Sequence, residues 1–326
     1  MNEFTVAAIQ AAPVHFNREA STDKACRLIA EAGEKGATLA AFGETWLPGY
    51  PVHAFAPREG GLWFEAAADY IDQAVEVPSE TTDRLCESAH KAGIDVVIGI
   101  VERDVRTQGT VYCCQLFIGR EGNILGKHRK LKPTADERIV WGQGDGTDLS
   151  VYQRPYGRIS GLICWEHMMM LPAYTLAAQG TQIHIACWPG SENQQPPDPP
   201  EYVFTQQHLL SRAFAVQSAC YVIAVACVMK PTDVPEKYRD MAWEDTGDSV
   251  IIDPRGVIIA GPAHGTEEII TATISLDQVR AAKSMIDVTG HYSRPDVFEV
   301  KVNGELVESL APVVSQQTEE ANTEQE

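Results

Sequence analysis

The sequence has 326 residues, of which 45 are Asp or Glu and 26 are Lys or Arg, so its formal net charge is −19. This acidic balance argues against nucleic acid or an anionic membrane as a partner, and a chain of this length can bury a core without a disulfide or metal staple. We find no internal repeat and no linker that would divide the chain into two domains.

The first half of the chain begins with a strand, a helix and a second strand, at residues 4–11, 18–36 and 37–42. Apolar residues recur at helical spacing before Gly36, and the apolar runs on either side are typical of buried strands. This unit favours a parallel strand pair. Two helices and three strands follow, and the short polar turns between these strands predict an antiparallel meander. They cover residues 58–75, 81–92, 94–102, 110–119 and 123–128.

In the second half, strands again alternate with helices. We expect strands at 149–153, 158–163, 182–187, 221–228, 249–252, 257–260, 268–274 and near 297–302. The expected helices are 168–178, 202–218 and 277–286, with a Pro-rich loop at 193–200. The expected inward face of the helix over 202–218 consists of Leu209, Leu210, Ala213 and Ala215.

A carboxylate, Glu44, directly follows the second strand and precedes a turn made rigid by Pro48 and Pro51. Ligand sites of open α/β sheets lie at the carboxyl ends of the strands, so Glu44 is a candidate proton acceptor. The alternative is an ordinary surface carboxylate. The aromatic residues Trp46 and Tyr50 in the same turn favour the functional interpretation.

A basic segment, residues 127–133 (KHRKLKP), stands out in the otherwise acidic chain. Such a segment is usually only a solvated face. In an extended segment, however, alternate side chains point to opposite sides, so His128 and Lys130 would share one side. Glu137 follows shortly afterwards and offers a carboxylate partner. We therefore regard Lys130 as a candidate fixed cation.

Cys164 lies between the strand over 158–163 and the helix over 168–178, and we expect it at a strand-to-helix elbow. Unpaired backbone N–H groups at a helix start lower the pKa of a nearby thiol toward the reactive thiolate. The alternative is a small buried hydrophobic residue, since free cysteines are among the most buried residue types. Because Glu44, Lys130 and Cys164 each follow a strand, they would meet at one rim if the three strands were neighbours in one sheet.

Cysteine usage indicates a reduced, cytoplasmic protein. The eight cysteines lie mostly within apolar runs and show no disulfide-framework spacing. Cys113 and Cys114 would face opposite sides of a strand, which gives a redox role little support. Cys164 and His167 have half of a metal-site spacing without a second pair, so we expect no metal. The N-terminus lacks a basic region, and no segment reaches the roughly 18 apolar residues of a membrane span.

Four segments together resemble the nitrilase superfamily of carbon–nitrogen hydrolases, and within it the true nitrilases. They are 42–51 (FGETWLPGYP), 128–146 with its HRKLKPT and WGQGDG motifs, 164–167 (CWEH) and 290–296 (GHYSRPD). The resemblance covers residues 4–302 and implies an α/β fold, a four-layer α–β–β–α sandwich with mixed sheets. We expect one domain over residues 1–310, followed by an acidic, disordered tail over 311–326.

The resemblance also assigns roles. The family's catalytic glutamate, lysine and cysteine nucleophile and its supporting glutamate correspond to Glu44, Lys130, Cys164 and Glu137. An ordinary salt bridge to Arg138 or Lys132 is the alternative for Glu137. Many members have Pro where this chain has Gly43, a departure that changes local stiffness rather than chemistry.

Aromatic residues and one backbone group complete the expected site. The backbone N–H of Trp165 would join Lys130 in stabilising negative charge at the tetrahedral stages. Tyr50, Trp165 and Trp188 follow strand ends and would line the substrate pocket, as would Trp46. Packing in the core or at the rim is the alternative for each of them.

The resemblance implies a nitrilase that converts an organic nitrile and two waters to a carboxylic acid and ammonia through a cysteine thioimidate and an acyl-enzyme. It implies no cofactor and a homodimer or a larger homo-oligomer such as a spiral. An amidase, a cyanide hydratase or dihydratase, or a carbamoylase of the same superfamily would use the same three residues. A non-catalytic scaffold and a thiol redox enzyme are alternatives from other classes. The presence of all three catalytic residues, Glu44, Lys130 and Cys164, weighs against the scaffold. The lack of a resolving cysteine near Cys164 in sequence weighs against the redox enzyme.

Overall fold

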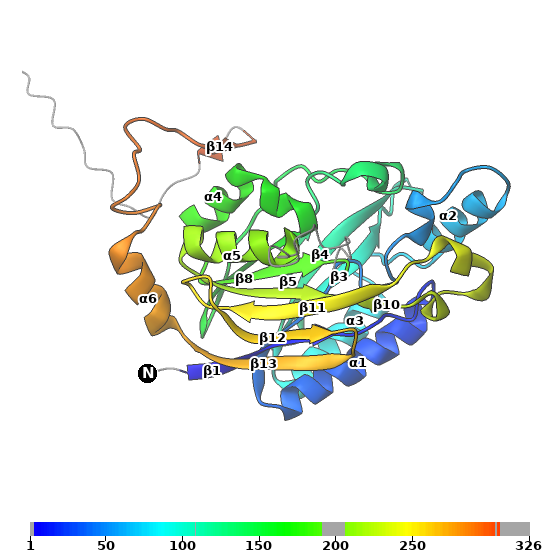
Figure 1. The fold of residues 1–326 in the computed structure, drawn as a ribbon, viewed down its shortest axis with the longest axis horizontal. Coiled ribbons are helices and arrows are strands. Elements are labelled where there is room, and N and C mark those ends of the chain that lie inside the picture. Colours follow the sequence, from blue (N-terminus) through cyan, green and yellow to red (C-terminus); the bar gives the residue numbers. More distant parts are fainter. Residues whose placement is uncertain (1–2, 108, 191–205, 304, 307–326) are drawn as a thin grey trace, which may run out of the picture.

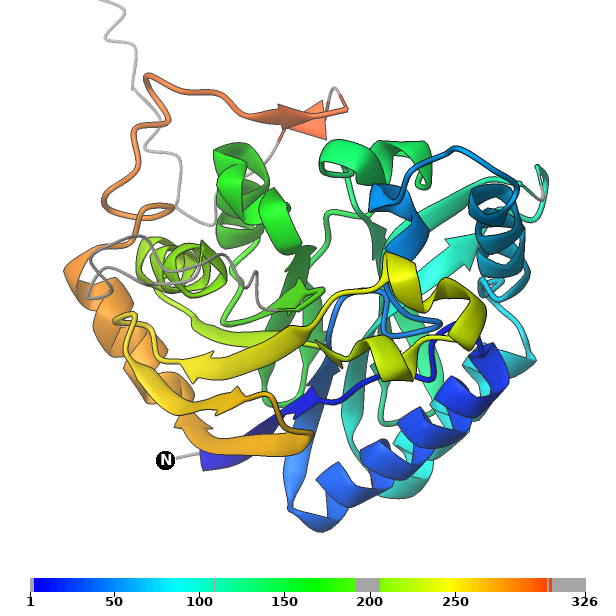
Figure 2. The ribbon, with the colours of Figure 1, turned by 45° about the vertical axis from the view of Figure 1, so that its right-hand side comes forward.

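The structure, a computed structural model, describes residues 3–107, 109–190, 206–303 and 305–306. Two mixed β-sheets pack face to face, and helices cover the outer side of each sheet (Figure 1, Figure 2). Apolar side chains fill the space between the sheets, among them Val6 and Leu39 from one sheet and Ile185 and Ile223 from the other. The expected α–β–β–α sandwich with mixed sheets is confirmed.

The first sheet has the strand order β13-β1-β2-β3-β4-β5. The strands β1 and β2 pair in parallel, as do β2 and β3, whereas β3, β4 and β5 form the expected antiparallel meander. The bounds are β1 (Glu3–Gln10), β2 (Ala37–Phe42), β3 (Asp95–Arg103), β4 (Val111–Gly119), β5 (Asn123–Arg129) and β13 (Glu268–Ser275). The carboxyl ends of β2 and β5 lead directly into Glu44 and Lys130.

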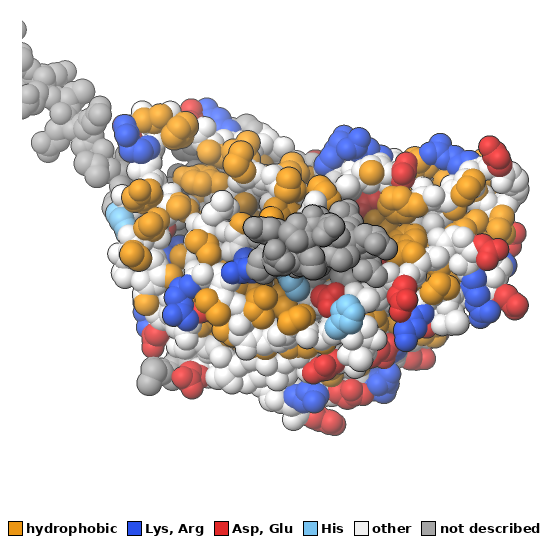
Figure 3. Space-filling view, viewed as in Figure 1, with side chains coloured by type: hydrophobic (Ala, Val, Ile, Leu, Met, Phe, Trp, Pro, Cys, Tyr) orange, Lys and Arg blue, Asp and Glu red, His pale blue; other side chains and the backbone are white. Residues whose placement is uncertain are grey.

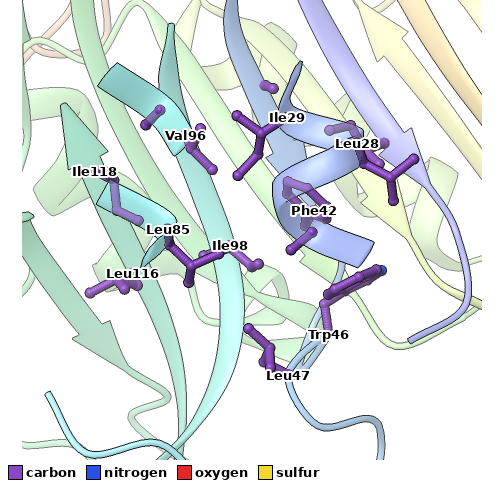
Figure 4. Packing of buried hydrophobic residues seen from close by; sticks show 14 of the residues in the cluster. Leu28, Ile29, Phe42, Trp46, Leu47, Leu85, Val96, Ile98, Leu116 and Ile118 are labelled. Carbon is purple, nitrogen blue, oxygen red and sulfur yellow. The ribbon is translucent and has the colours of Figure 1, made fainter. Parts of the chain in front are cut away.

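Helices α1 (Arg18–Glu34) and α3 (Glu80–Ala92) cover the outer face of the first sheet. Figure 4 shows Leu28 and Ile29 of α1 beside Phe42 at the end of β2. Leu28 and Ile29 are buried because the apolar positions of α1 recur every three or four residues and so form one face. Packing against this face holds the end of β2, and therefore Glu44, in place.

The second sheet has the order β10-β11-β9-β8-β7-β6, and β12 pairs with β11. Its central strands β7, β8 and β9 are parallel and almost entirely buried, as expected for strands covered on both faces. The bounds are β6 (Tyr152–Arg154), β7 (Gly157–Ile163), β8 (Ile183–Trp188), β9 (Tyr221–Ala226), β10 (Val228–Met229), β11 (Asp245–Ile252) and β12 (Ile258–His264).

Helices α4 (Met170–Ala178) and α5 (Gln206–Ser218) lie on the outer side of the second sheet, followed later in the chain by α6 (Leu276–Met285) (Figure 2). The predicted inward face of α5 is wrong for Leu209, which is 56% exposed. Its buried residues are Gln207, His208, Ser211, Phe214, Ala215 and Ser218. Several of these polar groups find hydrogen-bond partners in the sheet, such as the Asp248 carbonyl for His208, and these bonds offset the cost of burial.

The other elements are short. They are α2 (Leu62–Asp72), the 3₁₀ turns η1 (Val52–Phe55), η2 (Ala135–Ile139), η3 (Cys164–Met168), η5 (Pro231–Asp233) and η6 (Glu236–Met241), and the strands β14 (Lys301–Val302) and β15 (Glu305–Leu306). The strand expected near 297–302 is thus reduced to two residues. The expected loop at 193–200, the domain boundary at residue 310 and the tail over 311–326 lie outside the described residues. In the part of the chain that is described, no helix combines the length and apolarity needed to span a membrane.

Gly99 in β3 packs directly behind the turn that carries Glu44. A Cβ atom at this position would lie 2.2 Å from the Gly43 carbonyl oxygen and 2.5 Å from the Thr45 nitrogen. Because both are backbone atoms, we expect Gly99→Ala to lower the free energy of unfolding by roughly 1–3 kcal/mol through overpacking. Denaturant unfolding measures the change.

Gly61→Ala is the matched control for Gly99→Ala. A Cβ atom on Gly61 would meet no atom within 4 Å, and its φ of −76° is accessible to any residue. We expect this control to keep the stability of the wild-type protein. A Gly99→Ala variant as stable as the Gly61→Ala variant would contradict the close packing behind Glu44.

Candidate active site

Lys130 is buried between two carboxylates. Its Nζ atom lies 2.7 Å from Glu44 Oε1 and 2.8 Å from Glu137 Oε2, and the Lys130 and Glu44 residues are each only 1% exposed. Lys130 and His128 both point inward, as the alternation along this extended segment predicts. An ammonium removed from water needs such paired charges, so the three side chains stabilise one another's positions.

Glu137 is itself held by two further donors. The Thr134 N–H donates to Glu137 Oε2 at 2.6 Å, and the Tyr50 hydroxyl donates to Glu137 Oε1 at 2.5 Å. The alternative was a salt bridge to Arg138 or Lys132, but the cation that Glu137 pairs with is Lys130, and the Arg138 guanidinium donates to the Pro133 carbonyl. Glu137 is part of the buried Lys130 network.

Cys164 enters this region from the second sheet, where it follows β7. The three strands that precede Glu44, Lys130 and Cys164 are therefore not neighbours in one sheet, which was the condition under which the sequence would bring these residues to one rim. Strand pairing between distant segments decides sheet membership, and no local pattern in the sequence reports it. The two sheets instead bring Cys164 across the sandwich to the lysine, close enough for its sulfur to act electrostatically on Lys130.

Cys164 is 3% exposed and starts the 3₁₀ turn η3 rather than the α-helix, which begins at Met170. Its φ of +53° lies in the left-handed region, which is costly for a residue with a side chain. Such strain is retained where surrounding contacts over-determine the backbone. In this protein the strained residue is Cys164 itself, the first residue of the 3₁₀ turn η3.

Glu166 ties the Cys164 turn to the segment that carries Lys130. Its Oε2 accepts from the Ile163 N–H at 2.8 Å, and its Oε1 accepts from the Leu131 N–H at 2.7 Å. His128 Nε2 lies 3.0 Å from the same carboxylate. One buried side chain therefore links the residue before Cys164 with the residue after Lys130, and so holds the two sheets in register at the site.

His167 holds the Cys164 backbone from the other side. Its Nδ1–H donates to the Cys164 carbonyl at 2.7 Å, which leaves Nε2 to accept from His184 Nε2–H at 3.0 Å. His184 Nδ1 then accepts from the Ser160 hydroxyl at 2.9 Å. Burial lowers the pKa of His167 to about 4 and that of His184 well below its ordinary value, so both imidazoles are neutral. Among the described residues no group of three or more His, Cys, Asp or Glu is arranged to hold a metal ion.

The electrostatics of the site favour a proton acceptor. Burial raises the pKa of Glu44 to about 7, and the opposing charge of Lys130 does not cancel this effect. Burial alone would lower the pKa of Lys130, but Glu44, the Cys164 sulfur and Glu137 outweigh it and raise that pKa well above its ordinary value. Lys130 therefore stays charged, while Glu44 can exchange a proton near neutral pH.

A cavity of about 740 Å³ opens onto this network. Cys164 and Glu137 form part of its wall, while Glu44 and Lys130 lie behind that wall. Its lining residues are Tyr50, Phe55, Thr134, Ala135, Glu137, Cys164, Trp165, Pro189, Gly190, Trp243, Glu244 and Asp245. The aromatic members make the cavity suitable for an apolar organic substrate whose reacting carbon reaches Cys164.

Two of the four aromatic predictions agree with this cavity. Tyr50 and Trp165 line it, whereas Trp46 is buried in the core behind the first sheet. The expected pocket role of the Trp188 side chain does not fit the geometry, because its indole packs against His167 and donates to Ser211. The Trp188 carbonyl instead accepts the Glu44 N–H at 2.9 Å and so positions the glutamate backbone.

Sequence reasoning missed Phe55 and Trp243. Phe55 and Trp243 both lie in sequence segments without helix or strand periodicity, so neither had a local signal of pocket exposure. In the structure their rings pack edge to face with centroids 5.6 Å apart. Tyr50 joins them, and its ring lies 6.0 Å from that of Trp243.

A family model described as carbon-nitrogen hydrolase matches residues 5–284 of the sequence. The chain belongs to the carbon-nitrogen hydrolase family. "Nitrilase 2" from an unknown prokaryotic organism is 50% identical over 305 residues, 92% of this chain and 93% of that protein. An "aliphatic nitrilase" from Sinorhizobium fredii (strain HH103) is 36% identical over 317 residues, 94% of this chain and 97% of that protein. These matches confirm the resemblance to the nitrilase superfamily.

The solved structure of a carbon-nitrogen hydrolase from Helicobacter pylori G27 aligns with a TM-score of 0.72 at 20% identity. The alignment covers 91% of this chain and 96% of that chain. At this identity the alignment shows a shared fold.

The pair of His128 and Glu166 in this carbon-nitrogen hydrolase makes a pH-dependent contribution to stability. Glu166 and Asp148 outweigh the opposing effect of burial and raise the pKa of His128 to about 10. Because this folded-state pKa lies above the ordinary 6.5, the contribution is complete below about pH 6.5 and is lost as the pH rises toward 10. We expect His128→Gln to cost about 3 kcal/mol or more at pH 6 and much less near pH 10.

Urea unfolding of the wild-type protein and of His128→Gln at pH 6 and pH 10 measures the cost of the substitution at each pH. His90→Gln is the control, because the His90 ring is exposed and its hydrogen-bond partner is the Arg120 backbone carbonyl rather than a carboxylate. We expect this control to change the free energy of unfolding equally at both pH values. An equal cost of His128→Gln at pH 6 and pH 10 would show that the pair does not titrate as stated.

Proposed function

We propose that this carbon-nitrogen hydrolase is a nitrilase, which converts an organic nitrile and two waters to a carboxylic acid and ammonia. The observation that carries the proposal is the position of Cys164 in the wall of the cavity that Glu137 also lines, with the buried pair of Lys130 and Glu44 behind that wall. A cysteine, a carboxylate and an ammonium supply the nucleophile, proton transfer and charge stabilisation that a nitrile carbon requires. The relatives named as nitrilases support a nitrile as the substrate.

The first half of the proposed reaction forms a bond between the sulfur and the nitrile carbon. Glu44 accepts the Cys164 proton, and its pKa near 7 suits this exchange. The thiolate adds to the carbon of the C≡N group, and the proton passes to nitrogen to give a thioimidate. Glu44 Oε2 is suited to this transfer because it is buried and has no hydrogen-bond partner among the described residues.

The second half consumes both water molecules. Glu44 activates the first water, which adds to the thioimidate carbon, and ammonia leaves as the thioester forms. A second water then hydrolyses the thioester, which releases the carboxylic acid and restores the Cys164 thiol. Lys130 and the Trp165 backbone N–H would stabilise the charge at each tetrahedral stage, where loss of one such donor typically costs about 3 kcal/mol.

A homodimer or larger homo-oligomer is part of the proposal. Hydrophobic side chains gather on the surface formed by α4 and α5 (Figure 3). The exposed apolar residues there include Met170, Leu171, Leu209 and Val216. An exposed apolar face of this kind supports packing against a second copy of the chain.

The assay for the proposed function compares nitriles with their matching amides. With aliphatic, aromatic and arylacetonitrile substrates, we expect acid and ammonia from at least one nitrile and slower turnover of its amide. Equal or faster turnover of the amide would favour an amidase. Turnover of cyanide without any organic nitrile would favour a cyanide-hydrating enzyme.

Cys164→Ala should reduce ammonia release by at least about a thousandfold, because no other group replaces the nucleophile. The fold should be retained, which circular dichroism and thermal unfolding check. Cys220→Ala is the control, since Cys220 is equally buried but packs in the core, away from the cavity lining. Turnover by Cys164→Ala at the wild-type rate would contradict the mechanism.

A further inference from the structure

We propose that Cys113 is a positioning residue for Glu44: its thiol donates to Glu44 Oε1 and, together with Lys130, reserves that oxygen for binding and the other oxygen for reaction. The inference rests on the proposed function, because it concerns the carboxylate that would accept the Cys164 proton. It gives a role to one member of the adjacent pair Cys113 and Cys114.

The contact is built into the first sheet. Cys113 lies on β4, and its Sγ atom is 3.3 Å from Glu44 Oε1, the same oxygen that Lys130 Nζ approaches at 2.7 Å. The Lys130 N–H also donates to the Cys113 carbonyl at 2.8 Å. The two donors are therefore fixed relative to each other by the backbone, and they reach Glu44 as a unit.

The two oxygens of Glu44 are used unequally. Oε1 has both donors, whereas Oε2 is buried and has no hydrogen-bond partner among the described residues. A buried carboxylate oxygen without a partner is costly, and in native proteins such atoms call for an explanation. Two donors on Oε1 prevent the carboxylate from rotating, so Oε2 stays available for a proton.

Cys113 donates because it is a neutral thiol. Burial and the charge of Glu44 raise the pKa of Cys113 well above its ordinary value. An S–H group is a weak donor, but it stabilises the ionised carboxylate more than the protonated form, so it lowers the pKa of Glu44.

The other titratable groups around Glu44 do not mask the effect of Cys113 on the pKa of Glu44. The titratable and charged groups that act on Glu44, or are acted on by it, are Lys130, Glu137, Cys113, Tyr50, Tyr70, Cys187 and Cys227, together with Cys164, whose proton Glu44 accepts in the proposed mechanism. Burial raises the pKa of both tyrosines and of Cys187 and Cys227, so these four stay neutral near pH 7. Among these groups, Lys130 and Glu137 supply the charge, and neither is altered by a substitution at Cys113.

Cys114 supplies the matched control. It follows Cys113 in β4 but faces the opposite side of the sheet, where it packs in the core beneath α1 and α3. It is as fully buried as Cys113. Cys114→Ala therefore removes the same number of atoms from the same strand without touching Glu44.

The experiment measures kcat/KM against pH for Cys113→Ala, Cys113→Val, Cys113→Ser and Cys114→Ala with a nitrile that the wild-type enzyme hydrolyses. For Cys113→Ala and Cys113→Val we expect the acidic limb, near pH 7 in the wild type, to move up by about half a unit to one unit. Below the limb this lowers kcat/KM about three- to tenfold, and the alkaline plateau is retained. Cys113→Ser keeps a donor and should move less, and Cys114→Ala should leave the limb in place.

An equal loss of kcat/KM at all pH values would overturn the inference, because a merely structural role would act that way. So would a Cys113→Ser profile identical to that of Cys113→Ala. Cys113→Val fills the volume of the thiol, which keeps the test valid if Cys113→Ala does not fold.

Alkylation of Cys164 by iodoacetamide, followed by peptide mass spectrometry across the same pH range, needs no nitrile. We expect the acidic limb of the alkylation rate to move up most for Cys113→Ala and Cys113→Val, less for Cys113→Ser, and not at all for Cys114→Ala. If the wild-type protein hydrolyses no nitrile, the proposed function fails, and alkylation still decides the role of Cys113. If nitriles are hydrolysed and neither limb shifts, only the inference about Cys113 fails.

Discussion

The burial of one ammonium group between two carboxylates is the constraint on which the site depends. Lys130 is removed from water, and moving an ion into a protein interior costs several kcal/mol unless it is paired. Glu44 and Glu137 supply that pairing and must themselves stay in reach. The ends of β2 and β5 and the turn η2 are therefore held together by charge as well as by apolar packing. The same burial raises the pKa of Glu44 into the neutral range.

A second constraint joins the two sheets. Cys164 comes from the sheet opposite Lys130, so no strand ladder connects them. Glu166 makes the connection by accepting one N–H beside each residue, and His128 neutralises its charge. His167 supports the Cys164 carbonyl from within the second sheet. These buried polar side chains hold the left-handed Cys164 turn in place, since its backbone conformation would otherwise be unfavourable.

Local patterns predicted most elements well, because periodicity reports directly which side of a strand or helix is buried. The strand over 37–42 and the meander β3-β4-β5 agree with the structure. Leu209 was wrongly placed on the inward face of α5, because the buried positions of this helix are largely polar and several are bonded to the sheet. The helix expected after Cys164 begins later, because a 3₁₀ turn intervenes. Both errors arise where hydrogen bonds to distant residues outweigh local preference.

By itself, the sequence determined which residue types stand at the strand ends: a carboxylate after β2, a lysine after β5 and a cysteine after β7. The motifs around them were sufficient to indicate the family. Only the tertiary structure decided that Cys164 faces Lys130 from the opposite sheet, that Trp243 rather than Trp188 lines the cavity, and that Cys113 contacts Glu44. The physical reason is that side-chain convergence depends on strand pairing and sheet packing between distant segments. Neither leaves a periodic signal in the residues concerned.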